Sequence, residues 1–429
     1  MMRALYSLIL YLALPFILLR LRLRARKAPA YALRWRERFG FVPVLSSEKP
    51  VVWLHTVSVG EFLAALPLIR QLQQDEVQLV ITTTTPTGSE RVKAALGDSV
   101  YHVYAPYDLP DCLARFMRRV QPSLMLMMET ELWPNTLAAC HKRVVPAVLI
   151  NGRLSARSAR GYQKFSALTR PMLAQLTAAG IQHRDDADRF AALGLPTERI
   201  RVTGNIKFDI QLADALRQRA AQLKEEWTDH GKRLVWIAAS THTGEDEIIL
   251  DAFSRLKNAN TAAAQSLLLV LVPRHPERFN NVAELCEKRG FAIVRRSQGV
   301  TPAAADILVG DTMGELQLLF GASDIAFVGG SLVPNGGHNM LEPAAWQLPL
   351  NSGPHVFNFA ESARLLQANN ALVLAEDAAA LAADTLQLIE APALRLQRGE
   401  AALAVVENNR GALERTLQLI RQFIVKQKD

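Results

Sequence analysis

The pattern that most constrains this chain is an alternation of short apolar runs with amphipathic stretches. One series of such runs lies between residues 51 and 150, and a second begins near Arg233. Continuous apolar strands joined by helices are typical of a parallel sheet that is covered on both faces. We therefore predict an α/β protein with two doubly wound domains in tandem. The expected strands are 51–55, 77–82, 100–104, 123–128 and 146–150, followed by 234–239, 266–272, 291–296, 306–310, 324–330 and 348–353.

Length and composition narrow the class of protein further. The 429 residues exceed one compact core and fit two domains of roughly 150–200 residues each. Hydrophobic residues make up 49% and charged residues 21%, which excludes a disordered chain and a polytopic membrane protein. Cys112, Cys140 and Cys286 lack C-x-x-C spacing, so we expect reduced thiols in a cytosolic compartment.

The first forty residues differ from the rest of the chain. An apolar run, 4–19, would form a helix about 24 Å long, and basic residues follow it at once. Residues 1–40 hold nine basic residues and one acid, which leaves 40 of each sign elsewhere. A charge confined to one end predicts contact with an anionic membrane surface and no nucleic-acid partner. We expect a signal anchor or an interfacial helix whose basic flank stays cytoplasmic, and the sequence leaves open which.

A first acidic motif follows the expected strand 51–55. Gly60 allows a tight turn, and Glu61 then falls in or near the first turn of the next helix. A carboxylate there either complements the helix dipole or removes a proton from a substrate hydroxyl. We expect the helix N-terminus to keep it ionised at neutral pH.

A second acidic motif, Glu129 and Glu131, follows the strand 123–128. Both carboxylates face the same way if the strand persists through them. Otherwise they belong to a capping arrangement for a helix that begins near Pro134. The sequence leaves both interpretations open.

Two basic motifs carry charges that a phosphate could use. Lys207 lies in the segment 203–209, where an exposed lysine in a turn is the simpler interpretation on spacing alone. Arg274 and His275 follow the strand 266–272 between two prolines, which restrict the loop and present both side chains. A charged surface loop is the alternative for this second motif.

A glycine-rich segment, 329–345, offers bare amides before an expected helix start near Asn339. Such amides and a helix dipole suit a nucleotide phosphate, and Glu342 could accept hydrogen bonds from ribose hydroxyls. The segment is neither a Walker loop nor a dinucleotide fingerprint. The nine histidines show no metal-binding spacing and no clustered partners, so we expect no metal site.

Together these motifs resemble the Kdo transferases, which move 3-deoxy-D-manno-oct-2-ulosonic acid (Kdo) from CMP-Kdo onto a lipid A precursor. The matching segments run in order over almost the whole chain. They are HTVSVGE (55–61), ETELWPN (129–135), NGRLSARSARGY (151–162), TGNIKFD (203–209), AASTHTGED (238–246), VPRHPER (272–278), GDTMGEL (310–316), FVGGS (327–331) and GGHNMLEPAA (336–345).

The resemblance implies a GT-B fold, in which two Rossmann-like domains face a cleft and an N-terminal helix anchors the chain in the membrane. The expected boundaries are 1–27 for the anchor and its basic flank, 28–208 for the acceptor domain, 209–405 for the CMP-Kdo domain, and 406–429 for a helix that packs back on the first domain.

The resemblance also implies roles for individual residues. Glu61 is the expected general base, and Glu131 and Lys207 are expected to stabilise the transition state. The expected donor-binding residues are Arg274, His275, Met313, Gly314, Glu315, Gly330, Ser331, Asn339, Met340, Leu341 and Glu342. No cofactor and no metal are expected. For the acceptor, Arg153, Arg157, Arg160, Tyr162, Lys164 and Phe165 are candidates, with a solvated helix as the equal alternative.

The expected activity is an inverting transfer of Kdo from CMP-Kdo to lipid IVA, in the synthesis of the lipopolysaccharide inner core at the cytoplasmic side of a bacterial inner membrane. The alternatives are a GT-B transferase that uses a UDP-sugar and a membrane-tethered protein that binds a nucleotide sugar without catalysis. The number of Kdo residues added and the oligomeric state stay open.

Overall fold

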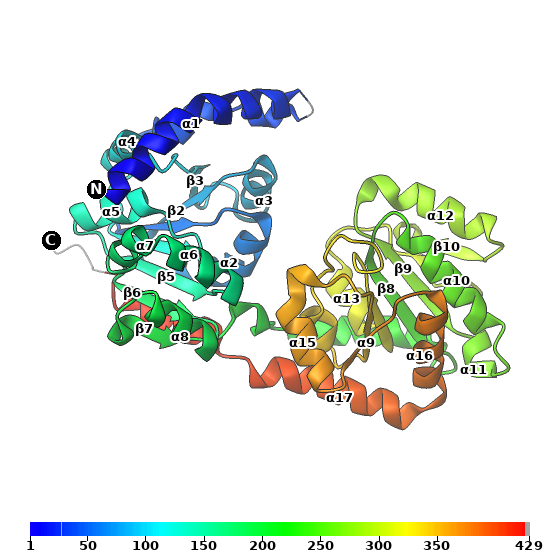
Figure 1. Ribbon diagram of the computed structural model, residues 1–429. Helices are drawn as coiled ribbons and strands as arrows, with labels where there is room; N and C mark the ends of the chain where they lie inside the picture. Colours follow the sequence, from blue (N-terminus) through cyan, green and yellow to red (C-terminus); the bar gives the residue numbers. More distant parts are fainter. Residues whose placement is uncertain (27, 425–429) are drawn as a thin grey trace. The chain divides into compact units, whose positions relative to one another are not determined.

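The computed structural model describes residues 1–26 and 28–424 and divides into two compact units (Figure 1). Unit 1 comprises Met1–Asp209 and the C-terminal segment from Arg410, and unit 2 comprises Ile210–Asn409. Lys27 of the expected basic flank and residues 425–429 of the expected C-terminal helix lie outside the described residues.

Unit 1 contains a seven-stranded parallel sheet in the order β3-β2-β1-β4-β5-β6-β7. Its strands are β1 (Val51–His55), β2 (Gln78–Thr83), β3 (Tyr101–Tyr104), β4 (Leu124–Met128), β5 (Ala147–Gly152), β6 (Ala178–Ile181) and β7 (Ile200–Val202). Its helices are α1 (Met2–Ala25), α2 (Val59–Leu72), α3 (Pro86–Leu96), α4 (Pro110–Val120), α5 (Pro134–Lys142), α6 (Ala156–Lys164), α7 (Ser166–Leu173), α8 (Arg184–Ala192) and α18 (Ala412–Arg421), with 3-10 turns η1 (Pro29–Ala32), η2 (Trp35–Phe39), η3 (Thr197–Arg199) and η4 (Ile206–Phe208).

Two apolar layers bury the faces of this sheet. Val52 and Leu54 of β1 point into a layer formed with α2, α3 and α18, whereas Val51 and Trp53 point into a layer formed with α4, α5, α7 and α8. This alternation is what a strand of period two produces when helices cover both faces. The central strands of the sheet are therefore buried on both faces, whereas the edge strand β7 is partly exposed.

Unit 2 repeats the architecture with the strand order β10-β11-β9-β8-β12-β13-β14. Its strands are β8 (Val235–Thr241), β9 (Leu268–Pro273), β10 (Ile293–Arg295), β11 (Ile307–Val309), β12 (Ile325–Val328), β13 (Leu350–Ser352) and β14 (Leu372–Leu374). Its helices are α9 (Asp214–Trp227), α10 (Glu245–Lys257), α11 (Ala262–Gln265), α12 (Phe279–Lys288), α13 (Leu316–Gly321), α14 (Leu341–Ala345), α15 (Ala360–Ala368), α16 (Ala378–Glu390) and α17 (Pro392–Asn408), with 3-10 turns η5 (Pro276–Arg278), η6 (Arg296–Gln298) and η7 (Phe357–Phe359).

The expected strands all form, with ends shifted by up to two residues. Three further strands, β6, β7 and β14, were not predicted from the sequence. They are only three or four residues long, and β7 and β14 lie at sheet edges. Segments so short carry too little periodicity to be recognised without their neighbours.

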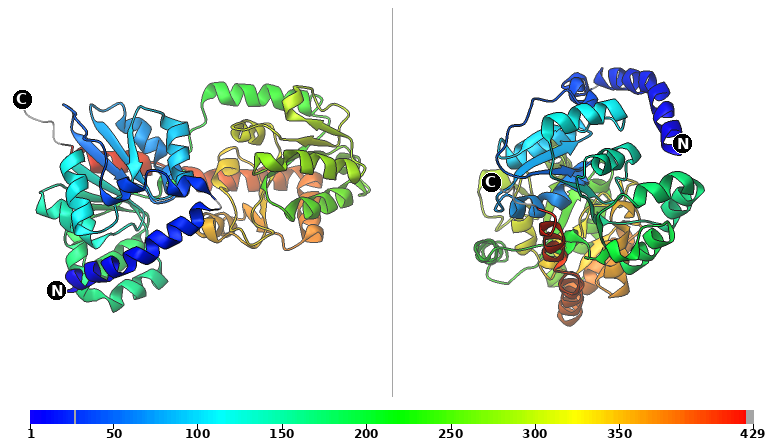
Figure 2. Two further views of the ribbon diagram at one scale, coloured as in Figure 1. Left: turned by 90° about the horizontal axis from the view of Figure 1, so that it is seen from above. Right: turned by 90° about the vertical axis from the view of Figure 1, so that its left-hand side faces the viewer.

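The N-terminal helix α1 lies along unit 1, with contacts to α5 and α7 (Figures 1 and 2). It is the one described helix long and apolar enough to cross a membrane, and only Ser7 in it is buried. Its exposed apolar side chains are Leu5, Leu8, Ile9, Tyr11, Leu12, Phe16, Leu19 and Leu23.

The C-terminal helix α18 packs against the sheet of unit 1, where it appears red in Figure 1. Its N-terminus is held by Asp209, whose two carboxylate oxygens accept the amides of Gly411 and Leu413, each at 2.6 Å. A carboxylate at this position satisfies amides that the helix itself cannot pair, and it complements the helix dipole. Asp209 therefore joins the end of the first long segment of unit 1 to its returning helix.

We predict that Asp209→Ala weakens the attachment of α18 by about 1–3 kcal/mol, because two amides lose a charged acceptor. Hydrogen–deuterium exchange of residues 412–421 should speed up while unit 2 keeps its protection. Asp75→Ala is the matched control, because Asp75 pairs with Arg421 near the exposed end of the same helix. Equal exchange in both variants would contradict the role given to Asp209.

Candidate active site

The strand order of unit 1 reverses between β1 and β4, so the loops after these two strands diverge at the carboxyl edge of the sheet. Open α/β sheets bind ligands at such a point. Glu61 follows β1, and Glu129 and Glu131 follow β4. The three predicted carboxylates therefore lie at one place. The charges of Glu131 and Glu129 contribute to a raised pKa of Glu61, and the charge of Glu129 contributes to a raised pKa of Glu131.

Glu61 is held by neutral donors at the start of α2. The Val57 amide donates to Oε2 and the Ser58 hydroxyl donates to Oε1, both at 2.8 Å. The Ser58 hydroxyl also accepts from the Glu61 amide at 3.2 Å and so caps the helix. Glu61 thus has the local helix-start role that the sequence suggested, at a position where it also faces the other two carboxylates.

Burial raises the pKa of Glu61 to about 7. Loss of solvent is the largest cause, the bonds from Val57 and Ser58 oppose it, and the charges of Glu131 and Glu129 add to it. The expectation that the helix N-terminus keeps Glu61 ionised at neutral pH is therefore wrong, because desolvation outweighs the stabilising bonds. A carboxyl group with a pKa near 7 can both take up and release a proton at neutral pH.

The strand β4 ends at Met128, so it does not persist through the two acids that follow. Helix α5 begins at Pro134, as the alternative interpretation expected, but neither acid caps it. Glu131 instead accepts a hydrogen bond from Trp133 Nε1 at 3.0 Å. Burial, with a further contribution from Glu129, raises the pKa of Glu131 despite this bond.

Glu129 is the carboxylate that pairs with cations. Lys207 Nζ lies 3.0 Å from its Oε1, and Arg153 Nε lies 2.7 Å from its Oε2. Its backbone is left-handed, with φ of 53°, which is costly for glutamate and is kept only where the surroundings demand it. The sequence interpretation chose Glu131 over Glu129 and so missed this pairing, which spacing alone does not reveal.

Lys207 is positioned by two asparagines that the sequence interpretation did not single out. The buried Asn151 accepts the Ile206 amide at 3.0 Å, and Asn205 accepts the Lys207 amide at 3.1 Å. These bonds shape η4, which also contacts α2, the helix of Glu61. Asn151 has a left-handed φ of 51°, which asparagine tolerates. This backbone conformation points to the role of Asn151, but it is known only from the structure.

In unit 2 the strand order reverses between β8 and β12. Glu245, at the start of α10 after β8, is fully buried and its carboxylate accepts the amides of Gly330, Ser331 and Leu332 at 2.6–2.9 Å. The Ser331 hydroxyl is also bonded within the unit, to the Val328 carbonyl. The predicted phosphate-facing amides of Gly330 and Ser331 thus already have an acceptor, which only the tertiary structure reveals.

The loop after β9 carries Arg274 and His275. It is fastened by Arg278, which pairs with Asp246 and donates to the Thr241 carbonyl at 2.7 Å. The Arg274 amide donates to the same carbonyl at 3.0 Å. An ion pair therefore adds to the prolines in fixing this loop beside the switch point of unit 2.

Three histidines gather at this switch point, so the expectation that the histidines lack clustered partners is wrong. His242 and His338 share a hydrogen bond of 2.8 Å between their Nε2 atoms, with ring planes 8° apart, and His275 packs edge-on against His242. Burial and the nearby charge of Arg274 lower the pKa of His338 to about 4. The three histidines come from three separate loops, so their spacing in the sequence does not predict that they meet.

The remaining predicted donor residues lie in two further groups. Asn339 donates to the Glu342 carboxylate at 3.1 Å and accepts the Leu341 amide at 3.1 Å, just before the five-residue helix α14. Burial raises the pKa of Glu342, although Asn339 and Arg274 oppose the rise. Arg274, His275, Asn339 and Glu342 are thereby brought together. Met340 and Leu341 are buried beside them.

Met313, Gly314 and Glu315 form the second group. Met313 is exposed, and Gly314 has a φ of 83° that favours glycine. Glu315 pairs with Arg296 at 3.1 Å and accepts from the Thr312 hydroxyl at 2.6 Å. These bonds lower the pKa of Glu315, although burial alone would raise it.

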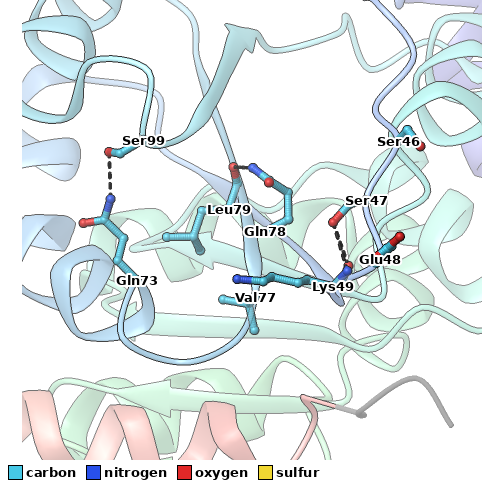
Figure 3. A pocket seen from close by; sticks show the side chains of 9 residues that line it. All are labelled: Ser46, Ser47, Glu48, Lys49, Gln73, Val77, Gln78, Leu79 and Ser99. Atoms are coloured by element: carbon cyan, nitrogen blue, oxygen red, sulfur yellow. Dashed lines mark hydrogen bonds between the residues drawn. The ribbon is translucent and has the colours of Figure 1, made fainter. Parts of the chain in front are cut away.

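No group of three or more His, Cys, Asp or Glu side chains in residues 1–26 and 28–424 is placed to hold a metal ion. A hollow of about 650 Å³ opens in unit 1, but Ser46, Lys49, Gln73 and Gln78 line it at the amino ends of β1 and β2 (Figure 3). It lies at the opposite end of the sheet from Glu61 and is lined by ordinary surface residues. It is therefore separate from the carboxylate site.

Comparison with known proteins shows the family to which the chain that carries these sites belongs. The family model of 3-deoxy-D-manno-octulosonic-acid transferases (kdotransferases) matches residues 33–210. The 3-deoxy-D-manno-octulosonic acid transferase of Haemophilus influenzae is 45% identical over 429 residues, which cover 99% of both chains. That of Bordetella pertussis is 36% identical over 432 residues, which cover 98% of this chain and 99% of the relative.

Two solved structures share the architecture. A glycosyltransferase from Rickettsia africae has a TM-score of 0.55 at 14% identity, over 88% of this chain and 99% of its own. UDP-GlcNAc 2-epimerase from Neisseria meningitidis has a TM-score of 0.53 at 15% identity, over 87% of this chain and 99% of its own. At such identities the likeness shows the fold alone, and it confirms the predicted GT-B fold with two Rossmann-like domains.

We predict that Glu131→Gln lowers the pKa of Glu61, because it removes a neighbouring negative charge. The Glu61 carboxyl should titrate near pH 7 in the wild type, measured by NMR of side-chain-labelled glutamate, and at lower pH in the variant. Glu76→Gln, an exposed substitution just beyond the far end of α2, is the control and should leave the titration unchanged. An unshifted midpoint in Glu131→Gln would show that the two carboxylates do not interact.

Proposed function

The chain belongs to the family of 3-deoxy-D-manno-octulosonic acid (Kdo) transferases and is a glycosyltransferase, and we propose that it transfers Kdo from CMP-Kdo to a lipid A precursor, lipid IVA, with inversion at the anomeric carbon. The observation that carries this proposal is Glu61, a carboxyl group with a pKa of about 7 beside Glu131 and the Glu129–Lys207 ion pair. Such a group is matched to accept a proton from a hydroxyl at neutral pH.

In the proposed reaction the acceptor hydroxyl attacks the anomeric carbon of Kdo while Glu61 takes its proton. The bond from that carbon to the phosphate oxygen of CMP breaks, and CMP leaves with the electron pair. One displacement inverts the configuration. Lys207, whose Nζ donates to Glu129, offers positive charge beside the carboxylate site for the departing phosphate. Glu131 adds the negative charge that helps to raise the pKa of the base.

We assign donor binding to the switch point of unit 2. Arg274 offers positive charge, and both Arg274 and His275 offer hydrogen-bond donors, to the phosphate and to the Kdo carboxylate, which are anionic. Glu342 offers a carboxylate to ribose hydroxyls. The buried bonds from Glu245 and Arg278 fix the two loops that carry these groups, so that little conformational entropy is lost when the donor binds.

We place the enzyme at the cytoplasmic side of a bacterial inner membrane. The support is α1, whose apolar side chains are exposed and whose last turns carry Arg20, Arg22 and Arg24. Apolar side chains can enter the acyl region while arginines contact anionic headgroups. An acylated acceptor then reaches unit 1 by lateral diffusion.

We further propose that transfer requires no metal and no other cofactor, because proton removal and charge stabilisation are both available from side chains of unit 1. Activity should persist in a chelator such as EDTA after extensive dialysis. Strict dependence on an added divalent cation would overturn this part of the proposal.

We predict that Glu61→Gln lowers the rate of Kdo transfer by about 10²–10⁴-fold, because the amide accepts no proton. Binding of CMP, measured by calorimetry, should be unchanged. The wild-type rate should rise roughly tenfold from pH 6 to pH 8, since the carboxyl is active when ionised and its pKa is about 7. Glu76→Gln is the control variant. Near-wild-type turnover by Glu61→Gln would remove Glu61 from the mechanism.

A competition assay separates the proposal from its alternatives. CMP should inhibit transfer and bind to the protein, while UDP at equal concentration should do neither. Preference for UDP would indicate a UDP-sugar transferase. Tight CMP binding without any Kdo product, with lipid acceptor and CMP-Kdo generated in the reaction, would indicate a binding protein without catalysis.

A further inference from the structure

The two sides of α1 differ chemically. Its outward side chains are apolar, whereas Tyr6 and Ser7 turn hydroxyl groups toward unit 1. Ser7 is buried, and its Oγ accepts from Asn135 Nδ2 at 2.9 Å. A helix that served only to hold a protein at a bilayer would need apolar surface, and hydroxyl groups in hydrocarbon would lack partners. The inward side of α1 therefore calls for a separate explanation.

Asp108 is the point at which α1 meets the acceptor domain. Its buried carboxylate accepts the Asn135 amide at 3.0 Å, the Thr136 amide at 2.7 Å and the Thr136 hydroxyl at 2.7 Å. Partial burial and the charge of the same carboxylate raise the pKa of the Tyr6 hydroxyl. Because Asn135 and Thr136 form the first turn of α5, this carboxylate caps α5, and Asn135 in turn bonds Ser7 of α1.

The same helix start ends the segment that carries the site acids. We call residues 129–136 the carboxylate segment. The end of β4 fixes its beginning, and the bonds from Asp108 fix its end. Glu131 lies between these two points, held by Trp133. A loop with both ends fixed has few conformations left, so the seating of α1 bears directly on where Glu131 lies.

Tyr162 on α6 gives a second connection between α1 and the site. Burial and the charge of Glu131 raise the pKa of the Tyr162 hydroxyl, and Tyr162 also interacts electrostatically with Tyr6. The ring packs against the same apolar layer as α5 and α7. Tyr6, Tyr162 and Glu131 are therefore linked electrostatically, although they come from sequence positions far apart.

We propose that α1 is a positioning element of the acceptor site as well as a membrane anchor: through Asp108 and Asn135, its Tyr6 and Ser7 hold the carboxylate segment in its active arrangement. The proposal rests on the proposed function, because it gives Glu131 a place beside the acceptor. It also requires that α1 stays seated on unit 1 and meets the lipid with its outward side chains, in the plane of the membrane. A helix that left the domain to span the bilayer would break these bonds.

The test compares Tyr6→Phe/Ser7→Ala with Tyr11→Phe. Tyr11 lies on the same helix and donates to a carboxylate, that of Asp111 at 2.5 Å, but Asp111 belongs to α4 and pairs there with Arg115. Both variants keep the apolar side chains of α1. We expect kcat for Kdo transfer in detergent micelles to fall about tenfold in Tyr6→Phe/Ser7→Ala, because the carboxylate segment is misplaced, and to stay near wild type in Tyr11→Phe.

Two further measurements separate positioning from tethering and from misfolding. Hydrogen–deuterium exchange of residues 129–140 should speed up in Tyr6→Phe/Ser7→Ala only, with unchanged exchange in unit 2 and unchanged sedimentation with anionic phospholipid vesicles. Wild-type activity and exchange in this variant would overturn the proposal. So would a loss of activity that occurs on vesicles and disappears in micelles, since that result assigns α1 to tethering. Failure of the wild type to transfer Kdo would instead overturn the proposed function. The exchange measurement does not depend on activity, so it would still test whether α1 holds the carboxylate segment.

Discussion

The functional chemistry of this chain depends on one constraint, the reversal of strand order in each parallel sheet. Loops that leave neighbouring strands in opposite directions cannot cover the edge between them, so polar groups collect there. In unit 1 that edge holds Glu61, Glu129 and Glu131, and in unit 2 it holds the loops around Glu245 and His338. The central strands β1, β4, β8 and β12 keep these loops fixed, because their side chains are buried on both faces.

The distribution of charge at the edge in unit 1 sets apart one carboxylate. Lys207 and Arg153 both pair with Glu129, while Glu61 receives bonds from a neutral amide and a hydroxyl. Burial without a nearby cation raises the pKa of a carboxyl group, as it does for Glu61. Neighbouring acids can thus take different roles. In unit 2, Glu245 fixes backbone amides, and Arg274 interacts with the histidine cluster, where we propose that the donor binds.

By the two proposals made for it, the N-terminal helix would join a membrane surface and the carboxylate site in a single element. Its outward leucines and basic last turns suit a lipid surface, and its inward hydroxyls reach Asp108 and Asn135 at the start of α5. Buried polar networks of this kind specify one arrangement, because each lost partner leaves another group unsatisfied. An enzyme that takes its acceptor from the membrane would gain from having its lipid contact and its catalytic loop share such a network.

Periodicity and motif order alone determined the class of this protein: two parallel α/β domains, an apolar basic N-terminus, and acids after β1 and β4. These features are local, since strand and helix patterns and the residues at strand ends are written in consecutive positions. Only the tertiary structure decided that Glu129 and not Glu131 pairs with Lys207, that Glu245 occupies the amides of Gly330 and Ser331, and that three histidines meet. Pairings between distant segments, and the loss of solvent that shifts the pKa of Glu61, arise only when the chain packs.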